Sequence, residues 1–135
     1  MSWIPSFSYD SQRFYTLQTC YILTGERITF LLGFLNSAVS FFYITKVCYS
    51  LSEASNRWIK QYVERIPVPE ITEENRVLSS NIHDLVNKIT NLKQNNPVFS
   101  TQDLENQVDD WVFKLYDLTD EEQKIIRTSI LNNTK

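Results

Sequence analysis

The longest apolar run in the chain extends from Ile28 to Tyr49 and holds a single charged residue, Lys46. Its length would suit a helix that crosses a membrane. Small or polar residues recur at helical spacing along one side of it, however: Thr29, Gly33, Asn36, Ser37 and Ser40. Such a stripe lets another backbone approach closely, so we expect one helix buried against a sheet. The membrane alternative stays open, because small-residue stripes also pack transmembrane helices.

Aromatic, β-branched and threonine residues dominate the segment that precedes this helix. Residues of these types favour extended structure. The runs Arg13–Leu17 and Thr19–Leu23 therefore predict two short strands, which pair most simply as an antiparallel hairpin. Gly25 ends the second strand before the helix begins.

The second half of the chain shows a helical pattern. Ile66–Pro69 contains two prolines and is predicted to be a rigid, non-helical exit from the first half. Thr72 is a suitable N-cap for a helix that ends near Lys93. Its apolar positions alternate in steps of four and three, a heptad seam, formed by Leu78, Ile82, Leu85, Ile89 and Leu92.

A second seam follows after a loop that contains Asn96-Pro97. Ser100 or Thr101 is predicted to cap this helix, whose apolar positions are Leu104, Val108, Trp111 and Leu115. Two seams joined by a short loop predict an antiparallel helical hairpin, although both seams could simply face the core of the domain. Thr119–Glu122 has the pattern of a capping box and predicts a terminal helix.

Together these elements predict an α+β fold. Short antiparallel strands would pack on a buried helix, followed by an antiparallel helical hairpin and a terminal helix. We expect two units, residues 1–70 and residues 71–135.

Composition supports an intracellular globular protein. The N-terminal residues do not have the pattern of a signal peptide, so a cytoplasmic location is expected. The cysteines, Cys20 and Cys48, are far apart and outside any metal-binding spacing, and we expect both to be buried, reduced thiols. The formal net charge of −3 argues against tight independent binding to nucleic acid. The charges are partly sorted, however, because the front of the chain is mildly basic and the back acidic.

Catalytic motifs are absent from the sequence. The one histidine, His83, has no cluster of partner residues and is expected to be a surface residue. Asp109 and Asp110 are adjacent on a predicted helix, so they point to different faces, and both are expected to be solvated. No phosphate-binding or nucleotide-binding glycine motif occurs, and the chain has only two glycines. We expect no catalytic residue, no metal site and no cofactor site in these residues.

Several segments, taken in order, resemble the TaqI-like C-terminal specificity domain. They are Thr19–Thr24, Leu31–Ser37 with its Leu-Gly-Phe-Leu-Asn-Ser core, Phe41–Tyr43, and Arg65–Pro69 with Ile-Pro-Val-Pro. The helical tail at Val108–Glu122 is also similar to the ending of these proteins. Asp117 stands where such tails usually carry glycine, and an aspartate can adopt the left-handed cap conformation at a cost of about 1 kcal/mol.

The resemblance implies a DNA target-recognition module of bacterial restriction-modification systems, specifically of adenine-specific DNA methyltransferases and type IIG restriction enzymes. It also implies an upstream methyltransferase domain that binds S-adenosylmethionine, whose motifs are not in this sequence, so we expect this chain to be the C-terminal part of a specificity domain. DNA and the methyltransferase domain or subunit are then the expected partners. The candidate contacts with DNA are Arg13, Arg57, Trp58, Lys60, Gln61 and Arg65.

Two other functions remain alternatives. The heptad helices could dock another subunit or form a homo-oligomer, since the tail also resembles type I specificity subunits, which use helices to bind partners. Alternatively, Ile28–Tyr49 could anchor a small membrane protein, which the small-residue stripe makes the less favoured hypothesis.

Overall fold

A computed structural model describes residues 7–16, 20–49 and 63–133 of the chain. All regular structure in these ranges is helical. The helices are α1 (Ile28–Leu35), α2 (Ala38–Tyr49), α4 (Arg76–Asn95), α5 (Gln102–Leu115) and α6 (Asp120–Asn133). Because the described ranges contain no β-strand, the prediction of an α+β fold was wrong.

The residues predicted to form strands adopt irregular structure instead. Residues 13–16 and 20–23 are exposed, and no strand lies beside them in the described ranges, while residues 17–19 fall outside those ranges. A preference for extended structure is largely a preference for packing on a pleated, half-buried surface. These residues have the composition of strands without such a surface to pack on.

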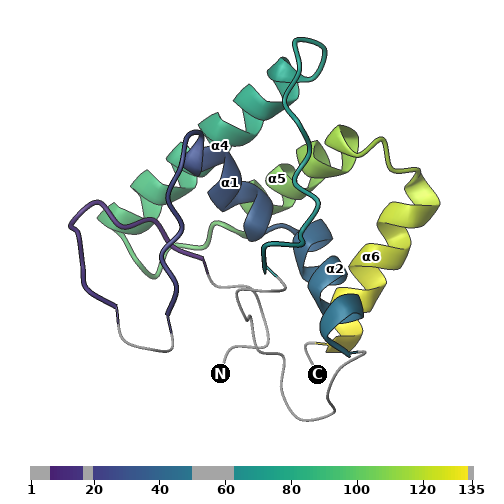
Figure 1. Cartoon of the computed structure of the whole chain (residues 1–135), viewed down its shortest axis with the longest axis horizontal. Coiled ribbons are helices and arrows are strands. Elements are labelled where there is room, and N and C mark those ends of the chain that lie inside the picture. Colours follow the sequence, from purple (N-terminus) through teal and green to yellow (C-terminus); the bar gives the residue numbers. More distant parts are fainter. Residues whose placement is uncertain (1–6, 17–19, 50–62, 134–135) are drawn as a thin grey trace.

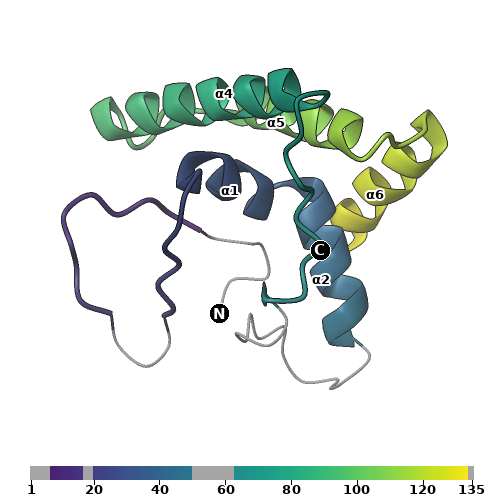
Figure 2. The same cartoon turned by 45° about the horizontal axis from the view of Figure 1, so that its top comes forward.

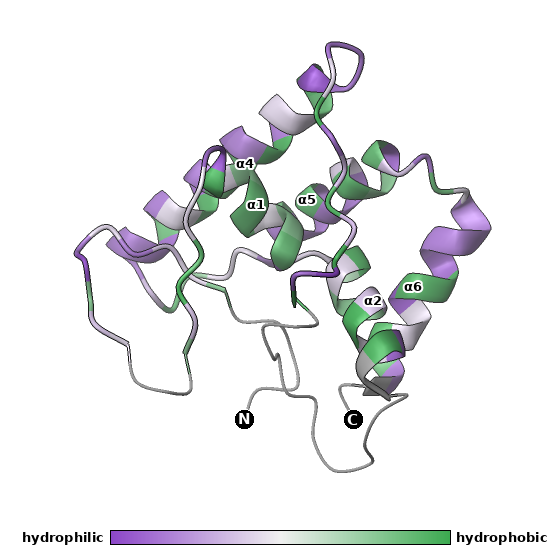
Figure 3. Cartoon of the chain, viewed as in Figure 1, coloured by the Kyte–Doolittle hydropathy of each residue, from purple (hydrophilic) through white to green (hydrophobic). Residues whose placement is uncertain are grey.

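The helices form two packed groups. The antiparallel pair α4 and α5 covers α1, while α2 and α6 lie side by side (Figures 1 and 2). The hydropathy of the chain follows this arrangement, since α1 and α2 are mostly apolar and the outer helices carry both apolar and polar faces (Figure 3). The amphipathic second half of the chain therefore shields the apolar helices of the first half.

The two heptad seams face the interior of the chain. Ile82 on α4 and Val108 on α5 are buried in the main core, and Leu85, Ile89, Trp111 and Leu115 pack against it. This is the alternative in which the seams serve the domain's own core. The helix α4, which carries the first seam, begins at Arg76 with Asn75 at its N-cap position, so the N-cap predicted at Thr72 was wrong. The backbone N–H of Thr72 instead donates to Asn75 Oδ1 at 2.8 Å, which forms a turn ahead of the helix.

The predicted single helix Ile28–Tyr49 is broken in two, and the prediction of one helix was wrong. The polar pair Asn36 and Ser37 separates α1 from α2, which differ in direction by 62°. Asn36 Nδ2 donates to the carbonyl of Leu32 at 3.0 Å, and the Ser37 hydroxyl donates to the carbonyl of Phe34 at 2.7 Å. These side chains satisfy the last carbonyls of α1, which lets the helix end there.

No single helix among the described residues is long and apolar enough to cross a membrane, although the bent pair α1 and α2 meets the length and composition criteria when the two are taken together.

Gly33 sets the distance between α1 and the helices that cover it. A Cβ atom at this position would lie 2.5 Å from Val86 Cγ2 and 3.0 Å from Ile82 Cγ2, both on α4. The expected close approach at the small-residue stripe therefore exists. Its partner is a pair of helices and not the sheet that the sequence predicted.

Asp109 joins α5 to the start of α2. Its carboxylate accepts a hydrogen bond from the backbone N–H of Ala38, the first residue of α2, at 2.7 Å. Burial raises the pKa of Asp109 to about 6, against the opposing effects of this hydrogen bond and of Arg127. The neighbouring Asp110 is exposed and pairs with Arg127 at 2.7 Å. The two carboxylates do point to different faces, but the expectation that both are solvated was wrong for Asp109.

The junction of α5 and α6 has the local structure that the sequence predicts. Asp117 has φ 52°, and the N–H groups of Leu118 and Asp117 donate to the carbonyls of Phe113 and Lys114. This is a Schellman ending with aspartate in the left-handed position. The capping box is confirmed as well, since the N–H of Thr119 donates to Glu122 Oε2 at 2.8 Å and the N–H of Glu122 donates back to the threonine hydroxyl at 3.4 Å. Both hydrogen bonds that Glu122 accepts from Thr119 lower the pKa of its carboxyl.

We predict that Gly33→Ala destabilises the chain. Replacing glycine within a helix by alanine gains about 1 kcal/mol of helix propensity, but forcing a methyl group against Val86 costs about 1–3 kcal/mol. Denaturant unfolding should show a lower free energy of unfolding for Gly33→Ala. Val86→Ala removes the atom that the new methyl group meets, so the double variant should lose less stability than the sum of the two single variants. Additive losses would contradict the contact.

Asp109 should make stability depend on pH in the acidic range. Because its pKa in the folded state is above the ordinary value of 3.8, the folded state binds the proton more tightly, and stability should fall as pH rises from about 4 to 6. Asp109→Asn keeps the acceptor for Ala38 without the charge. It should flatten this slope and raise the free energy of unfolding at pH 7 by about 1–2 kcal/mol, a value discounted for the partial exposure of the side chain. Asp110→Asn, the matched control on the exposed side, should keep the slope. A slope unchanged in Asp109→Asn would refute this account.

Candidate nucleic-acid interface

Arg13 lies in a long irregular segment between Phe7 and α1, which we call the aromatic segment (residues 8–16 and 20–26). In Figures 1 and 2 it projects away from the helices. The side chain of Asn36 holds its first end, because Oδ1 accepts from the N–H of Phe7 and Nδ2 donates to the carbonyl of Phe7, each at 3.0 Å. At the other end, the carbonyl of Arg27 accepts from Leu31 within the first turn of α1. The segment is therefore fixed to α1 at both ends.

A tight turn sets the backbone around Arg13. The carboxylate of Asp10 accepts hydrogen bonds from the N–H groups of Gln12 at 2.7 Å and Phe14 at 2.8 Å. Arg13 has φ 59°, in the left-handed region that costs a non-glycine residue roughly 1–2 kcal/mol. The two hydrogen bonds to Asp10 offset that cost, so the backbone of Arg13 has a defined conformation within the turn.

The aromatic segment exposes an unusual number of large apolar side chains. Single exposed apolar residues are normal on a protein surface, but a run of them marks an interaction site. Those exposed here are Tyr9, Phe14, Tyr15, Tyr21, Ile22 and Leu23. Their residue types predicted strands, so sequence analysis did not indicate this surface. Aromatic rings next to arginine can stack on nucleic-acid bases while the guanidinium contacts phosphate.

Arg65 lies elsewhere, just before the Ile-Pro-Val-Pro motif. Ile66 is buried in the main core, whereas Arg65 itself is exposed. Neither Arg13 nor Arg65 forms an ion pair within the part of the chain that the structure describes, and no contact there joins their side chains. The other four candidates for DNA contact lie outside the described residues; they are Arg57, Trp58, Lys60 and Gln61.

Metal-binding groups and reactive histidine and cysteine side chains are scarce in the described ranges. No group of three His, Cys, Asp or Glu residues there is arranged to hold a metal ion. His83 is exposed, as expected. Cys20 is an exposed free thiol, so the expectation of a buried cysteine was wrong for it, and the side chain of Cys48 is not among those described.

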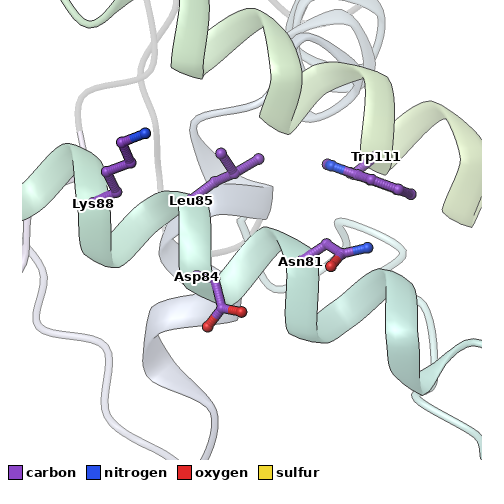
Figure 4. Close-up of a pocket in the computed structure, with 5 residues that line it drawn as sticks. All are labelled: Asn81, Asp84, Leu85, Lys88 and Trp111. Carbon is purple, nitrogen blue, oxygen red and sulfur yellow. The ribbon is translucent and has the colours of Figure 1, made fainter.

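A shallow pocket lies between α4 and α5. Figure 4 shows its lining side chains, which are Asn81, Asp84, Leu85, Lys88 and Trp111. The ammonium group of Lys114 lies 4.3 Å from the ring centroid of Trp111. One acidic and one basic side chain beside an indole ring provide neither a nucleophile with its base nor a set of metal ligands. We assign this pocket no catalytic role.

Tyr116 fixes the Ile-Pro-Val-Pro motif to the helical second half. Its hydroxyl donates to the carbonyl of Pro67, and its ring stacks on Phe34 of α1 with centroids 6.0 Å apart. Burial raises the pKa of Tyr116 to about 12. Together with the burial of Ile66, Tyr116 therefore holds the motif against the helical second half, a role that no sequence pattern indicated.

Tyr116→Phe should remove the hydrogen bond to Pro67 and keep the stacking. We expect a loss of about 1 kcal/mol in the free energy of unfolding. Because the folded state favours the neutral phenol, wild-type stability should also decline as pH rises from about 10 to 12, and this decline should be smaller in Tyr116→Phe. Tyr43→Phe serves as the control. Urea titrations at pH 7 and pH 11 test both effects, and equal stability of wild type and Tyr116→Phe at both pH values would exclude the role of the hydroxyl.

Comparison with known proteins identifies the first half of the chain. The family model for the TaqI-like C-terminal specificity domain matches residues 2–68. This range holds all six candidate DNA contacts, α1, α2 and nearly all of the Ile-Pro-Val-Pro motif. It does not include the helical tail, for which the sequence also suggested a resemblance. No curated protein and no solved structure matches the chain. Residues 2–68 of this chain belong to the family of TaqI-like C-terminal specificity domains.

Proposed function

We propose that this chain recognises target DNA for an adenine-specific methyltransferase or a type IIG restriction enzyme, and that it performs no catalysis itself. The observation that carries the proposal is the family match over residues 2–68. Proteins with such domains need a surface that positions the enzyme on DNA through phosphate contacts and reads base edges. The chemical step then belongs to the methyltransferase that works with the chain.

The aromatic segment with Arg13 is the described surface that best suits this role. Residues 1–68 contain six lysines and arginines against four acidic residues, a formal charge of +2, whereas residues 69–135 contain seven against twelve, or −5. The net charge of −3 is therefore unevenly distributed. Phosphate contacts through Arg13 and Arg65 are compatible with it, because charges more than about 10 Å away are largely screened at 0.1 M salt.

The cofactor and location follow from this proposal. We expect S-adenosylmethionine to bind only to the methyltransferase domain or subunit. Work on bacterial DNA implies a cytoplasmic location.

Helix-mediated docking receives less support as the main function. The apolar seams that would bind another subunit are largely used inside the chain, where Ile82 and Val108 are buried and Leu85 and Trp111 pack against the same core. Pairing of two copies through the seams would therefore compete with the core.

The test is selection of DNA from a random-sequence pool by the methyltransferase complex that contains the full chain. We expect one site to be enriched. Replacing Arg13, Arg57, Lys60 and Arg65 by alanine should weaken binding to that site. It should also reduce the slope of log affinity against log salt by about 0.9 for each phosphate that the variant no longer neutralises.

Arg76→Ala/Lys88→Ala is the control, because it removes two exposed charges from the acidic half of the chain. It should leave both the affinity and the slope close to those of wild type. The proposal fails if no site is enriched, or if removal of the chain from the complex leaves site recognition intact.

A further inference from the structure

The interface between α2 and α6 forms an open groove whose lining mixes polar groups with apolar side-chain surface. Lys46 of α2 lines one side and residues of α6 line the other, namely Lys124, Ile125, Thr128, Ser129 and Asn132. Its volume of about 530 Å³ is far larger than a single phosphate ion needs. The groove can therefore hold a stretch of phosphodiester backbone.

A buried apolar cluster fixes the two walls relative to each other. Ala38 of α2, Phe113 of α5 and Ile126 of α6 are all buried in it, and Phe42 and Ile130 pack against them. The lysines thus project from helices whose spacing is set by the core. This distinguishes the groove from a chance pair of surface lysines.

The electrostatics of the groove favour an anion. Neither Lys46 nor Lys124 forms an ion pair within the described ranges. Lys46 Nζ lies 5.3 Å from the ring centroid of Phe42, a contact that orients the ammonium group without neutralising it. The hydroxyl of Thr128 and the amide of Asn132 can add hydrogen-bond donors.

Of the two helices that form the groove, only α6 carries acidic side chains, and one of these is engaged in the capping box. α2 contains no acidic residue, whereas α6 carries three in its first turn, of which Asp120 and Glu121 lie four and three residues before Lys124. Glu122 accepts from Thr119 in the capping box, and Asp110 on α5 pairs with Arg127.

We infer that this groove binds the phosphate backbone of DNA, with Lys46 and Lys124 as its charged contacts. The inference rests on the proposed function and adds a contact region to it. Lys46 belongs to the matched residues 2–68, whereas Lys124 lies in the tail beyond them. The terminal helix would thus supply half of a contact site that the matched domain does not complete by itself.

The experiment measures binding of the full chain, within its methyltransferase complex, to a labelled random-sequence duplex, because phosphate contacts do not depend on sequence. For Lys46→Gln/Lys124→Gln the slope of log affinity against log salt should fall by about 1.8. The affinity at 0.1 M salt should fall by up to about 60-fold. This factor assumes that the two lysines add no affinity at 1 M salt, because a slope change of about 1.8 over a tenfold range of salt concentration corresponds to about 60-fold. Lys46→Arg/Lys124→Arg should keep both quantities, since it keeps the charges.

Two controls give the result its meaning. Lys88→Gln/Lys114→Gln removes the same total charge from α4 and α5 and should change neither slope nor affinity, while thermal unfolding should show that both double variants are folded.

Three outcomes would contradict a proposal. If Lys46→Gln/Lys124→Gln binds DNA with the affinity and salt slope of wild type, the inference is overturned and the proposed function stays intact. A complex that binds no DNA at any salt concentration overturns the proposed function itself. Protection of the groove lysines by inorganic phosphate, with unchanged binding of DNA, would show a small-anion site and also overturn the inference.

Discussion

The contact between Gly33 and α4 is the constraint on which the rest of the structure depends. At this point α1 lies so close to Val86 and Ile82 that only a residue without a side chain fits. The close approach allows Phe34, one residue further on, to be fully buried between Phe30 and Tyr116. It also brings α5 near, since Val108 is the third neighbour of the absent Cβ atom. A protein interior tolerates little change in volume, so this one distance fixes where the α4–α5 pair can lie.

The family domain and the tail consequently share one hydrophobic core. Buried residues from both sides of position 68 belong to it, Phe34 and Ile44 on one side and Val86 and Val112 on the other. Two polar contacts cross the same division, from Asp109 to the start of α2 and from Tyr116 to Pro67. The second half of the chain is thus a structural support for the domain that the family model recognises, and changes deep in the tail should be felt at the recognition surface.

The local signals at the junction of α5 and α6 were reliable, whereas the N-cap predicted at Thr72 was wrong, and so were the signals that needed a partner surface. The capping box at Thr119 and the left-handed Asp117 depend on neighbouring backbone atoms alone, and both were predicted. The strands were wrong because their residue types describe a half-buried surface, and the described residues offer no neighbouring strand. The break after α1 was missed because Asn36 and Ser37 fit the small-residue stripe of the single helix that the sequence predicted. The pair binds the last carbonyls of α1, and Asn36 also binds the backbone of Phe7, which is 29 residues away in sequence. The six candidate contacts came from charge and from family resemblance, and neither reveals how they are arranged in space.

Charge is distributed unevenly between the two halves that share this core, and the distribution affects how the chain can approach DNA. An acidic protein is repelled by DNA as a whole, but repulsion between exposed charges is weak beyond about 10 Å at 0.1 M salt, so local surfaces decide the outcome. Most of the acidic excess lies in the half that builds the support, while the aromatic segment with Arg13 projects from the other half. Long-range repulsion would also slow nonspecific association more than it weakens a close fit. An acidic support with a small basic contact surface therefore suits a module that is brought to DNA by a partner enzyme and contributes discrimination once it is there.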